Sequence, residues 1–468
     1  METLRLILAI LLPWATGFIW IGLLWRHDTP GALAARLGYG FFAGALLTAL
    51  IQVSFDGLGL PQHYWATLGA LGVLAVGGYG LSRLQPSPST PIVAPQPRLA
   101  SRWSGLNWRH AVVSLILLLL AMRFANFFLE IIWRPLYPWD AFTSWALPGR
   151  IWIEQGTLVP GYSGHPQLVS LFQFWPALAL GYWDESLINL PWFCCALGLA
   201  LAVYGQSRAL GASPLFALLL CYLLLSLPFL DVHILLAGYG DVWLGAFYAL
   251  ATLAFIRWAW QGDYRQALLA LGLALLLPYT KRTGILWTVT FIPALILWVI
   301  PGRWLLATTA LGVGGLILWY FTTGIDLTLP FGATMFTGRI LISPEQIIIP
   351  GYQGPGLKFF PVGDAFIQNF FFLGNWHLVW YLVPVAILWA AVYAWRDRLV
   401  AVALAPAVTG LASLFFLFFF SEHYSRYWAA DYTGLNRVFL NLVPALIVTL
   451  GAILIRYRKH PWPTLSAQ

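Results

Sequence analysis

Apolar runs of about twenty residues recur along the whole chain, and this repetition constrains the fold more than any other feature. A helix of that length crosses a hydrocarbon core roughly 30 Å thick, where every backbone polar group must be paired within the protein. Of the 468 residues, 60% are hydrophobic and 9% are charged, and the mean hydropathy is +0.77. These values lie far from those of soluble domains, so the sequence predicts an all-α polytopic membrane protein.

We expect about 13 transmembrane helices. They cover approximately residues 4–25, 35–55, 64–82, 110–130, 186–204, 213–230, 240–258, 265–280, 284–300, 304–323, 376–394, 399–420 and 437–456. The apolar run at residues 166–182 is not counted, because a full span there would put Arg208 and Arg257 on the side opposite to the other cytoplasmic cations. We expect a re-entrant or surface helix in its place. The first run lacks an Ala-x-Ala cleavage site, so we expect it to be retained.

Basic residues mark the cytoplasmic side of a membrane protein, and their distribution predicts a cytoplasmic C-terminus in the inner (plasma) membrane. The long connections then lie on the outer face, at residues 131–185, 324–375 and 421–436. A Pro/Ser-rich stretch on the inner side cannot be regular helix and reads as a linker. The predicted parts are an N-terminal three-helix group (1–84), a cytoplasmic linker (85–107), a transmembrane core (108–458) and a cytoplasmic tail (459–468).

The charge and the cysteines exclude several classes of protein. The net charge of +8 comes from 25 Lys and Arg against 17 Asp and Glu, without a long basic run that would bind nucleic acid. All three cysteines lie in apolar runs, where they behave as small hydrophobic residues rather than as a disulfide framework or a zinc site. P-loop, dinucleotide-binding and HExxH motifs are missing from the sequence, which argues against ATP-driven transport and metalloprotease chemistry.

Two carboxylates at the outer boundary are candidate catalytic residues. Asp140 follows a Pro-Trp pair at the edge of an apolar run, and Asp241 opens a later one. Each could cap a helix N-terminus, or could act in catalysis, with Asp140 as the general base. Asp231 and His233 lie just before Asp241 and are weak candidate ligands for a divalent cation. A divalent cation is the one cofactor that the sequence suggests.

Three cations at the same boundary are candidate phosphate ligands. Lys281 and Arg282 interrupt an apolar stretch together with two threonines, and Arg437 begins the last predicted span. They could clamp a phosphate, or could simply extend from helix ends towards the membrane surface. Polar and aromatic residues of the outer segments are candidate substrate-binding residues, because aromatic rings stack on sugar faces. These are Trp139, His165, Tyr239, Tyr352 and Lys358.

The segment 351–360, rich in Gly and Pro, belongs to an outer connection of about fifty residues, longer than a simple link needs. It could be a lid or an acceptor platform, or a packed surface loop.

Four local patterns, in this order along the chain, resemble the GT-C superfamily of membrane glycosyltransferases. They are Trp139-Asp140 followed by His165-Pro166, Gly238-Tyr239-Gly240-Asp241, Thr280-Lys281-Arg282-Thr283-Gly284, and Asn436-Arg437 ahead of a Leu-Val-Pro turn. The resemblance covers roughly residues 107–458. It implies a GT-C-like fold with interfacial helices in the first outer loop, and the first-loop Asp140 at the catalytic centre. Asp140 is followed by Ala141 rather than a second acidic residue, which separates the chain from protein O-mannosyltransferases.

The resemblance implies transfer of a sugar from a polyprenyl-phosphate carrier to a glycan, lipid or protein acceptor on the outer face. We expect an inverting single displacement in which Asp140 activates the acceptor hydroxyl and the phosphate departs towards Lys281, Arg282 and Arg437. Asp241 would orient the sugar. The alternatives are a non-enzymatic transporter or flippase of lipid-linked glycans, and a structural subunit. Convergence of these charged residues in one outward cavity would favour the enzyme.

Overall fold

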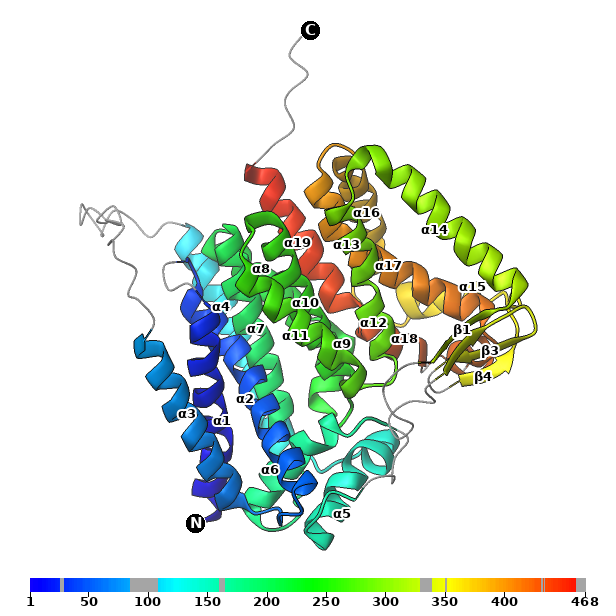
Figure 1. Ribbon diagram of the computed structural model, residues 1–468. Helices are drawn as coiled ribbons and strands as arrows, with labels where there is room; N and C mark the ends of the chain where they lie inside the picture. Colours follow the sequence, from blue (N-terminus) through cyan, green and yellow to red (C-terminus); the bar gives the residue numbers. More distant parts are fainter. Residues whose placement is uncertain are drawn as a thin grey trace. The chain divides into compact units, whose positions relative to one another are not determined.

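The computed structural model describes residues 1–25, 29–84, 108–159, 165–328, 339–349, 352–430, 432 and 434–459, and at a few positions within helices and strands it describes the backbone alone. Helices dominate this part of the chain (Figure 1), and every predicted apolar run contains at least one helix. The linker at 85–107 and most of the tail at 459–468 lie outside the described residues, so the domain boundary placed there stays a prediction.

Seven helices of the described part are long and apolar enough to cross a membrane, which marks the chain as membrane-embedded. They are α1 (Glu2–Leu24), α2 (Ala32–Gly57), α3 (Tyr64–Leu84), α4 (Trp108–Trp133), α7 (Leu190–Leu210, after the short η2 at Leu187–Asn189), α10 (Asp241–Gln261) and α17 (Arg398–Phe420). Two bent pairs raise the number to nine if each is one span: α8 (Pro214–Leu225) with α9 (Pro228–Leu235), and α18 (Gly434–Leu440) with α19 (Val443–Lys459).

The predicted number of 13 spans is not reached among the described residues, because four apolar runs form shorter helical stretches. These are α11 (Tyr264–Thr280), the pair α12 (Gly284–Val289) and α13 (Phe291–Val299), the stretch Ala307–Thr322 of α14 (Gly302–Thr322), and α16 (Val379–Ala394). The uncounted run at 166–182 forms α6 (Leu168–Leu180), whose 13 residues are also too few for a span. Residues 169–177 of this helix are buried within the protein, and its place as a re-entrant or surface helix of the membrane stays a prediction.

Contacts divide the chain into two compact units, and the first comprises Met1–Pro135 with Trp175–Leu223. In this unit α1 packs on α2 and α3, and α2 packs on α7. Small residues permit the close approach: a Cβ on Gly17 would lie 2.0 Å from the Gly40 oxygen, and one on Gly38 would lie 2.3 Å from the Ala202 nitrogen. Such contacts are typical of helices that associate within a membrane.

The second unit comprises Leu136–Phe174 and Leu224–Gln468, and α10 forms its centre. This helix packs on α11, α17 and α19, and 89% of its most apolar 18-residue stretch is buried. The Tyr248 hydroxyl shares a hydrogen bond of 2.8 Å with Thr290 and donates one of 3.0 Å to the Pro406 carbonyl. The helices around α10 are therefore tied together by polar contacts as well as by packing. The remaining helical elements are η1 (Ala141–Ala146), α5 (Leu147–Gln155), α15 (Gly363–Ile367), η3 (Gln368–Phe372) and η4 (Tyr424–Ala429).

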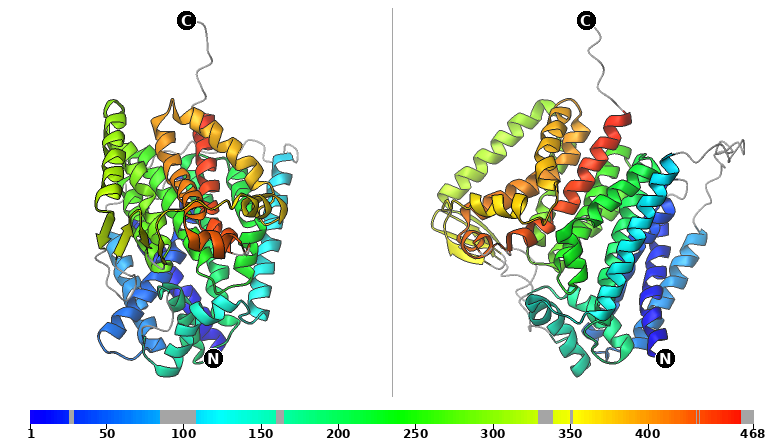
Figure 2. Two further views of the ribbon diagram at one scale, coloured as in Figure 1. Left: turned by 90° about the vertical axis from the view of Figure 1, so that its right-hand side faces the viewer. Right: turned by 180° about the vertical axis from the view of Figure 1, so that it is seen from behind.

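A small antiparallel sheet in the second unit departs from the all-α prediction. Its order is β1-β2-β3-β4, with β1 at Ile325–Thr328, β2 at Arg339–Ile342, β3 at Gln346–Ile349 and β4 at Tyr352–Pro355. Ile325 pairs with Ile342, and Leu341 pairs with Ile348. Isoleucine favours extended backbone, and these short runs are too brief for helices. Figure 2 shows the sheet beside the C-terminal end of α14, in the outer segment predicted at 324–375.

Candidate functional site

Four charged side chains that are distant in the sequence meet in one ion cluster of the second unit. Lys281 Nζ lies 2.5 Å from Asp241 Oδ1. Arg437 Nη1 lies 2.5 Å from Asp140 Oδ2, and its Nη2 lies 3.4 Å from Asp241 Oδ2. Arg437 therefore bridges the two carboxylates, while Asp241 bridges the two cations. We call this set of Asp140, Asp241, Lys281 and Arg437 the ion cluster.

Gly238 allows the chain before Asp241 to approach the segment that carries Asp140. Gly238 has a φ of +105°, and a Cβ there would lie 2.7 Å from Leu136 Cδ1 and 2.8 Å from Ala141 Cβ. The following turn leads directly into α10, of which Asp241 is the first residue. The side chain of Asp241 is fully buried, and it makes ion pairs rather than an N-terminal cap hydrogen bond.

Asp140 immediately precedes the π-helical segment η1, and it makes no side-chain cap either. Its side chain is 43% exposed, unlike that of Asp241. A π-helical turn is uncommon and is frequently found at functional sites. The capping alternative therefore fails for both carboxylates. Asp140 is the most exposed member of the ion cluster, and the Arg437 side chain is 23% exposed.

A sharp turn after α11 directs Lys281 into the interior. Pro278 lies in the last turn of α11, and Lys281 has extended backbone at φ −153°. The Gly284 nitrogen then donates a hydrogen bond of 2.8 Å to the Lys281 carbonyl. A Cβ on Gly284 would lie 1.8 Å from the Leu277 oxygen, so only glycine fits there. The Lys281 side chain is only 6% exposed, so it does not extend to the membrane surface.

Arg437 is held from two sides. Its guanidinium carbon lies 4.5 Å from the centre of the Tyr239 ring, within cation–π distance. The preceding residue, Asn436, accepts a hydrogen bond of 2.7 Å from Trp376 Nε1 and donates one of 2.5 Å to Asn369 Oδ1. These three residues are buried. A satisfied polar network of this kind fixes α18, and with it the direction of Arg437.

Aromatic contacts connect the two supports of Arg437. The Trp376 ring lies 5.4 Å from Phe229, Phe229 lies 4.4 Å from His233, and His233 lies 5.4 Å from Tyr239, all between ring centroids. His233 is buried, and its Nδ1 shares a hydrogen bond of 3.0 Å with the Phe229 carbonyl. Arg437 thus rests on a continuous wall of packed rings.

His165 lies close enough to the ion cluster to feel its charges. Its ring stacks on Trp145 at 4.4 Å. Burial lowers the pKa of His165 to about 4, and the positive charges of Lys281 and Arg282 act in the same direction. The carboxylates of Asp241 and Asp140 offset part of that effect. His165 is therefore neutral at physiological pH.

The electrostatics of the site favour an anionic ligand. Burial lowers the pKa of Lys281, and the neighbouring Asp241 carboxylate opposes this shift. Two carboxylates and two cations leave the ion cluster without net charge, and half-buried Arg282 adds a positive charge. Among the residues that the structure describes, the buried Nε of Arg282 has no hydrogen-bond partner. A phosphate could satisfy such a donor.

The other predicted substrate residues are not brought to the ion cluster by any contact within the described part. Trp139 adjoins Asp140, but its side chain is 78% exposed. Lys358 is exposed, with its Nζ 5.9 Å from the Phe360 ring. Tyr352 begins β4, and its side chain lies outside what the structure describes.

The metal candidates Asp231 and His233 both lie on α9. Among the described residues, no group of three His, Cys, Asp or Glu side chains could hold a metal ion.

Some residues of the site gave little sign of their role in the sequence. Trp145, Asn369, Trp376 and Asn436 resemble ordinary aromatic and polar residues of a membrane protein. The adjacency of Asn436 to Arg437 was the one available signal.

Comparison of the chain with protein families, with curated proteins and with solved structures finds no match in any of the three. The resemblance to the GT-C superfamily therefore rests on the local motifs themselves.

Proposed function

We propose that the protein is a membrane glycosyltransferase that moves a sugar from a polyprenyl-phosphate carrier to an acceptor hydroxyl. The observation that carries this proposal is the convergence of Asp140, Asp241, Lys281 and Arg437 from four distant segments. Buried charges are costly, and inside membrane proteins they are retained mainly for function. A partly exposed carboxylate beside one partly exposed cation and one buried cation offers a base and a phosphate site within one centre.

In the proposed reaction, the acceptor oxygen attacks the anomeric carbon of the donor sugar while Asp140 takes the hydroxyl proton. The bond from the anomeric carbon to the phosphate oxygen breaks, and its electron pair leaves with the polyprenyl phosphate. The configuration at the anomeric carbon is inverted in this single step. Negative charge grows on the departing phosphate, and Arg437 and Arg282 would stabilise it.

The bridging position of Arg437 gives Asp241 and Lys281 a supporting role. Asp241 is fully buried and holds Lys281 at 2.5 Å, so it is less accessible to an acceptor than Asp140. It holds both cations on one side of the site, and its negative charge offsets part of their positive charge. We propose that Asp140 exchanges its contact with Arg437 for the acceptor hydroxyl when the donor phosphate binds.

An apolar pocket of about 220 Å³ on the same helices suits the prenyl chain of the donor. Phe255 of α10, Ala270 and Ala274 of α11, and Phe291 of α13 contribute to its lining. Ala270 and Ala274 precede Lys281 by a distance of roughly 10 to 17 Å along α11, given a rise of 1.5 Å per residue. The phosphate-binding end and an apolar groove thus lie along one helix.

The test uses the purified full-length protein in lipid nanodiscs with a panel of polyprenyl-phosphate sugars. Wild-type protein is expected to release polyprenyl phosphate when an acceptor is present, and Asp140→Asn to lower that rate by about 10² to 10⁴. Glu154→Gln is the matched control, because Glu154 is an exposed outer-segment carboxylate paired with Arg150 at 3.5 Å. Transbilayer movement of the lipid without cleavage would instead establish the flippase alternative.

A further inference from the structure

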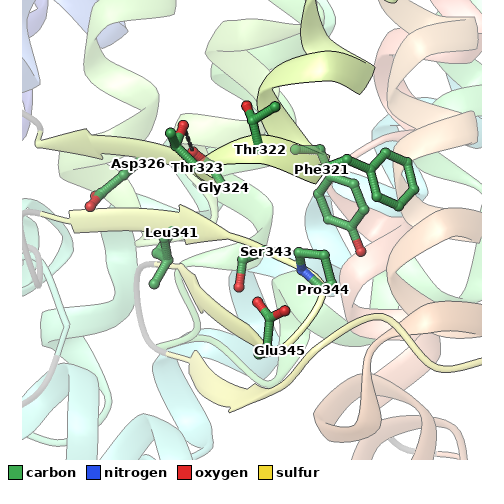
Figure 3. Close-up of a pocket in the computed structure, with 10 residues that line it drawn as sticks. Phe321, Thr322, Thr323, Gly324, Asp326, Leu341, Ser343, Pro344 and Glu345 are labelled. Atoms are coloured by element: carbon green, nitrogen blue, oxygen red, sulfur yellow. Dashed lines mark hydrogen bonds between the residues drawn. The ribbon is translucent and has the colours of Figure 1, made fainter.

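A second, chemically different pocket opens where α14 meets the sheet (Figure 3), with a volume of about 320 Å³. Tyr320 and Phe321 line it from the end of α14, with their ring centroids 4.8 Å apart. Asp326 of β1 contributes one carboxylate, and Glu345 in the turn between β2 and β3 contributes another. Hydroxyl groups of Thr322, Thr323 and Ser343 complete the polar lining.

Two glycines fix the shape of this pocket. Gly324 has a φ of +73°, and a Cβ there would lie 2.9 Å from Ser343 Cβ. The Gly356 nitrogen donates a hydrogen bond of 2.9 Å to the Glu345 carbonyl, and a Cβ on Gly356 would lie 1.8 Å from the Pro344 oxygen. The turn that carries Glu345 is thus hydrogen-bonded to, and closely packed on, the residue that follows β4. Ligand pockets are usually preformed in this way.

The lining of the pocket has the chemistry of a sugar site. Aromatic rings such as Phe321 pack on the C–H face of a pyranose ring. Carboxylates such as those of Asp326 and Glu345 accept hydrogen bonds from sugar hydroxyls. The described residues that line the pocket include two acidic residues and no Lys or Arg, so the lining disfavours a phosphate. The ion cluster has the opposite preference.

We propose that this pocket binds a sugar ring of a glycan acceptor, neutral or amino-bearing. The assignment as an acceptor site rests on the proposed glycosyl transfer, whereas sugar binding as such does not. The two sites of the second unit then sort their ligands by charge. The phosphate-bearing donor is attracted to Lys281, Arg282 and Arg437, and is repelled from Asp326 and Glu345. This gives the described residues around the pocket, at the end of α14 and in the sheet, the role of an acceptor platform.

The test measures sugar binding to the full-length protein in nanodiscs by saturation-transfer NMR, independently of turnover. The panel is glucose, mannose, galactose, N-acetylglucosamine and glucosamine, with glucose 1-phosphate as an anionic probe. At least one uncharged or amino sugar is expected to bind saturably. Phe321→Ala and Glu345→Gln are each expected to weaken that binding about tenfold, the loss of one stacking or hydrogen-bonding contact. Binding of glucose 1-phosphate is expected to be unaffected by either substitution.

Matched controls separate a pocket from a general surface effect. Phe359→Ala removes another exposed phenylalanine of the same outer segment, and Glu154→Gln removes an exposed carboxylate elsewhere. Both are expected to bind sugar like wild type. The proposal is overturned if no panel sugar binds saturably, or if the pocket variants bind like the controls. Binding of Ca²⁺ or Mg²⁺ alone that is lost in Glu345→Gln, without sugar binding, would also overturn it.

One further variant keeps the two proposals distinguishable. Asp140→Asn is expected to bind the panel sugar like wild type while losing transfer. Sugar binding without transfer by the wild-type protein would refute the proposed function and leave the pocket assigned. Transfer that depends on Asp140 but not on Phe321 or Glu345 would refute the pocket alone.

Discussion

Replacement of Asp241 by Asn should destabilise the fold strongly, whatever the protein's activity. The carboxylate is fully buried, and its partner Lys281 is only 6% exposed, with 2.5 Å between their charged atoms. Removal of one partner from a buried pair costs about 3 to 5 kcal/mol, because the remaining charge stays buried without compensation. In this variant Lys281 would also lie near a second cation, Arg437, so the upper part of that range is expected.

The reverse substitution should cost less. In Lys281→Met, Asp241 keeps Arg437 as a partner at 3.4 Å, and the methionine fills most of the volume of the lysine stem. We expect a loss of about 2 to 3 kcal/mol. In the double variant neither charge remains unpaired, so its loss should be smaller than the sum of the two single losses by at least about 2 kcal/mol.

The assay is equilibrium unfolding in mixed micelles, followed by tryptophan fluorescence, for wild type, both single variants and the double variant. Glu130→Gln is the matched control, because Glu130 pairs with Arg134 at 2.6 Å while both side chains are exposed. That substitution should cost under about 1 kcal/mol. Additive losses, or an equal cost for Asp241→Asn and Glu130→Gln, would refute the burial argument.

Three further outcomes follow from the site. Ala270→Phe fills the apolar pocket and is expected to raise the KM for a long-chain donor about tenfold while leaving a short-chain donor unchanged; equal effects on both donors would exclude the pocket as the chain site. Tyr239→Leu should lower turnover about threefold through loss of the cation–π contact with Arg437, whereas Tyr239→Phe keeps the ring and the rate; equal rates for the two variants would remove Tyr239 from the support. Below pH 6.5 the His165 side chain of the unfolded chain binds a proton, whereas that of the folded protein binds one only near pH 4, so the free energy of unfolding should fall by at most about 3 to 4 kcal/mol as the pH drops through this range. His165→Gln should flatten that pH dependence in unfolding titrations, and an unchanged slope would contradict the assignment.

The helices could be predicted from the sequence because their hydrogen bonds are local and apolar runs favour them in a membrane. The positions at which a predicted helix is interrupted could not be predicted. The run predicted at 284–300 divides into α12 and α13 at Thr290, whose hydroxyl bonds to Tyr248 and to the Trp287 carbonyl. These contacts depend on packing rather than on the composition of the run itself. The sheet was missed for a related reason, since its four-residue strands are defined by their pairing.

The members of the ion cluster could be predicted, but their partners could not. Asp140, Asp241, Lys281 and Arg437 share one predicted face of the membrane, and charge is rare enough there to single them out. Asp140 and Arg437 are 297 positions apart, and nothing local in either motif identifies the other. Asn436 was part of a motif, but its hydrogen bond with Trp376 was missed because buried polar networks leave no periodic pattern in a sequence.

The turn at Gly284 also restricts how the sequence of this protein can change during evolution. A side chain at this position would overlap the Leu277 carbonyl of α11. Substitution of Gly284 would therefore displace the turn and, with it, Lys281. Any descendant that retains the lysine should retain this glycine, even after most of the apolar residues have exchanged for one another. Distant homologues of the chain could thus be found by a local pattern: a proline in the last turn of a helix, then a lysine, then a glycine three positions after the lysine.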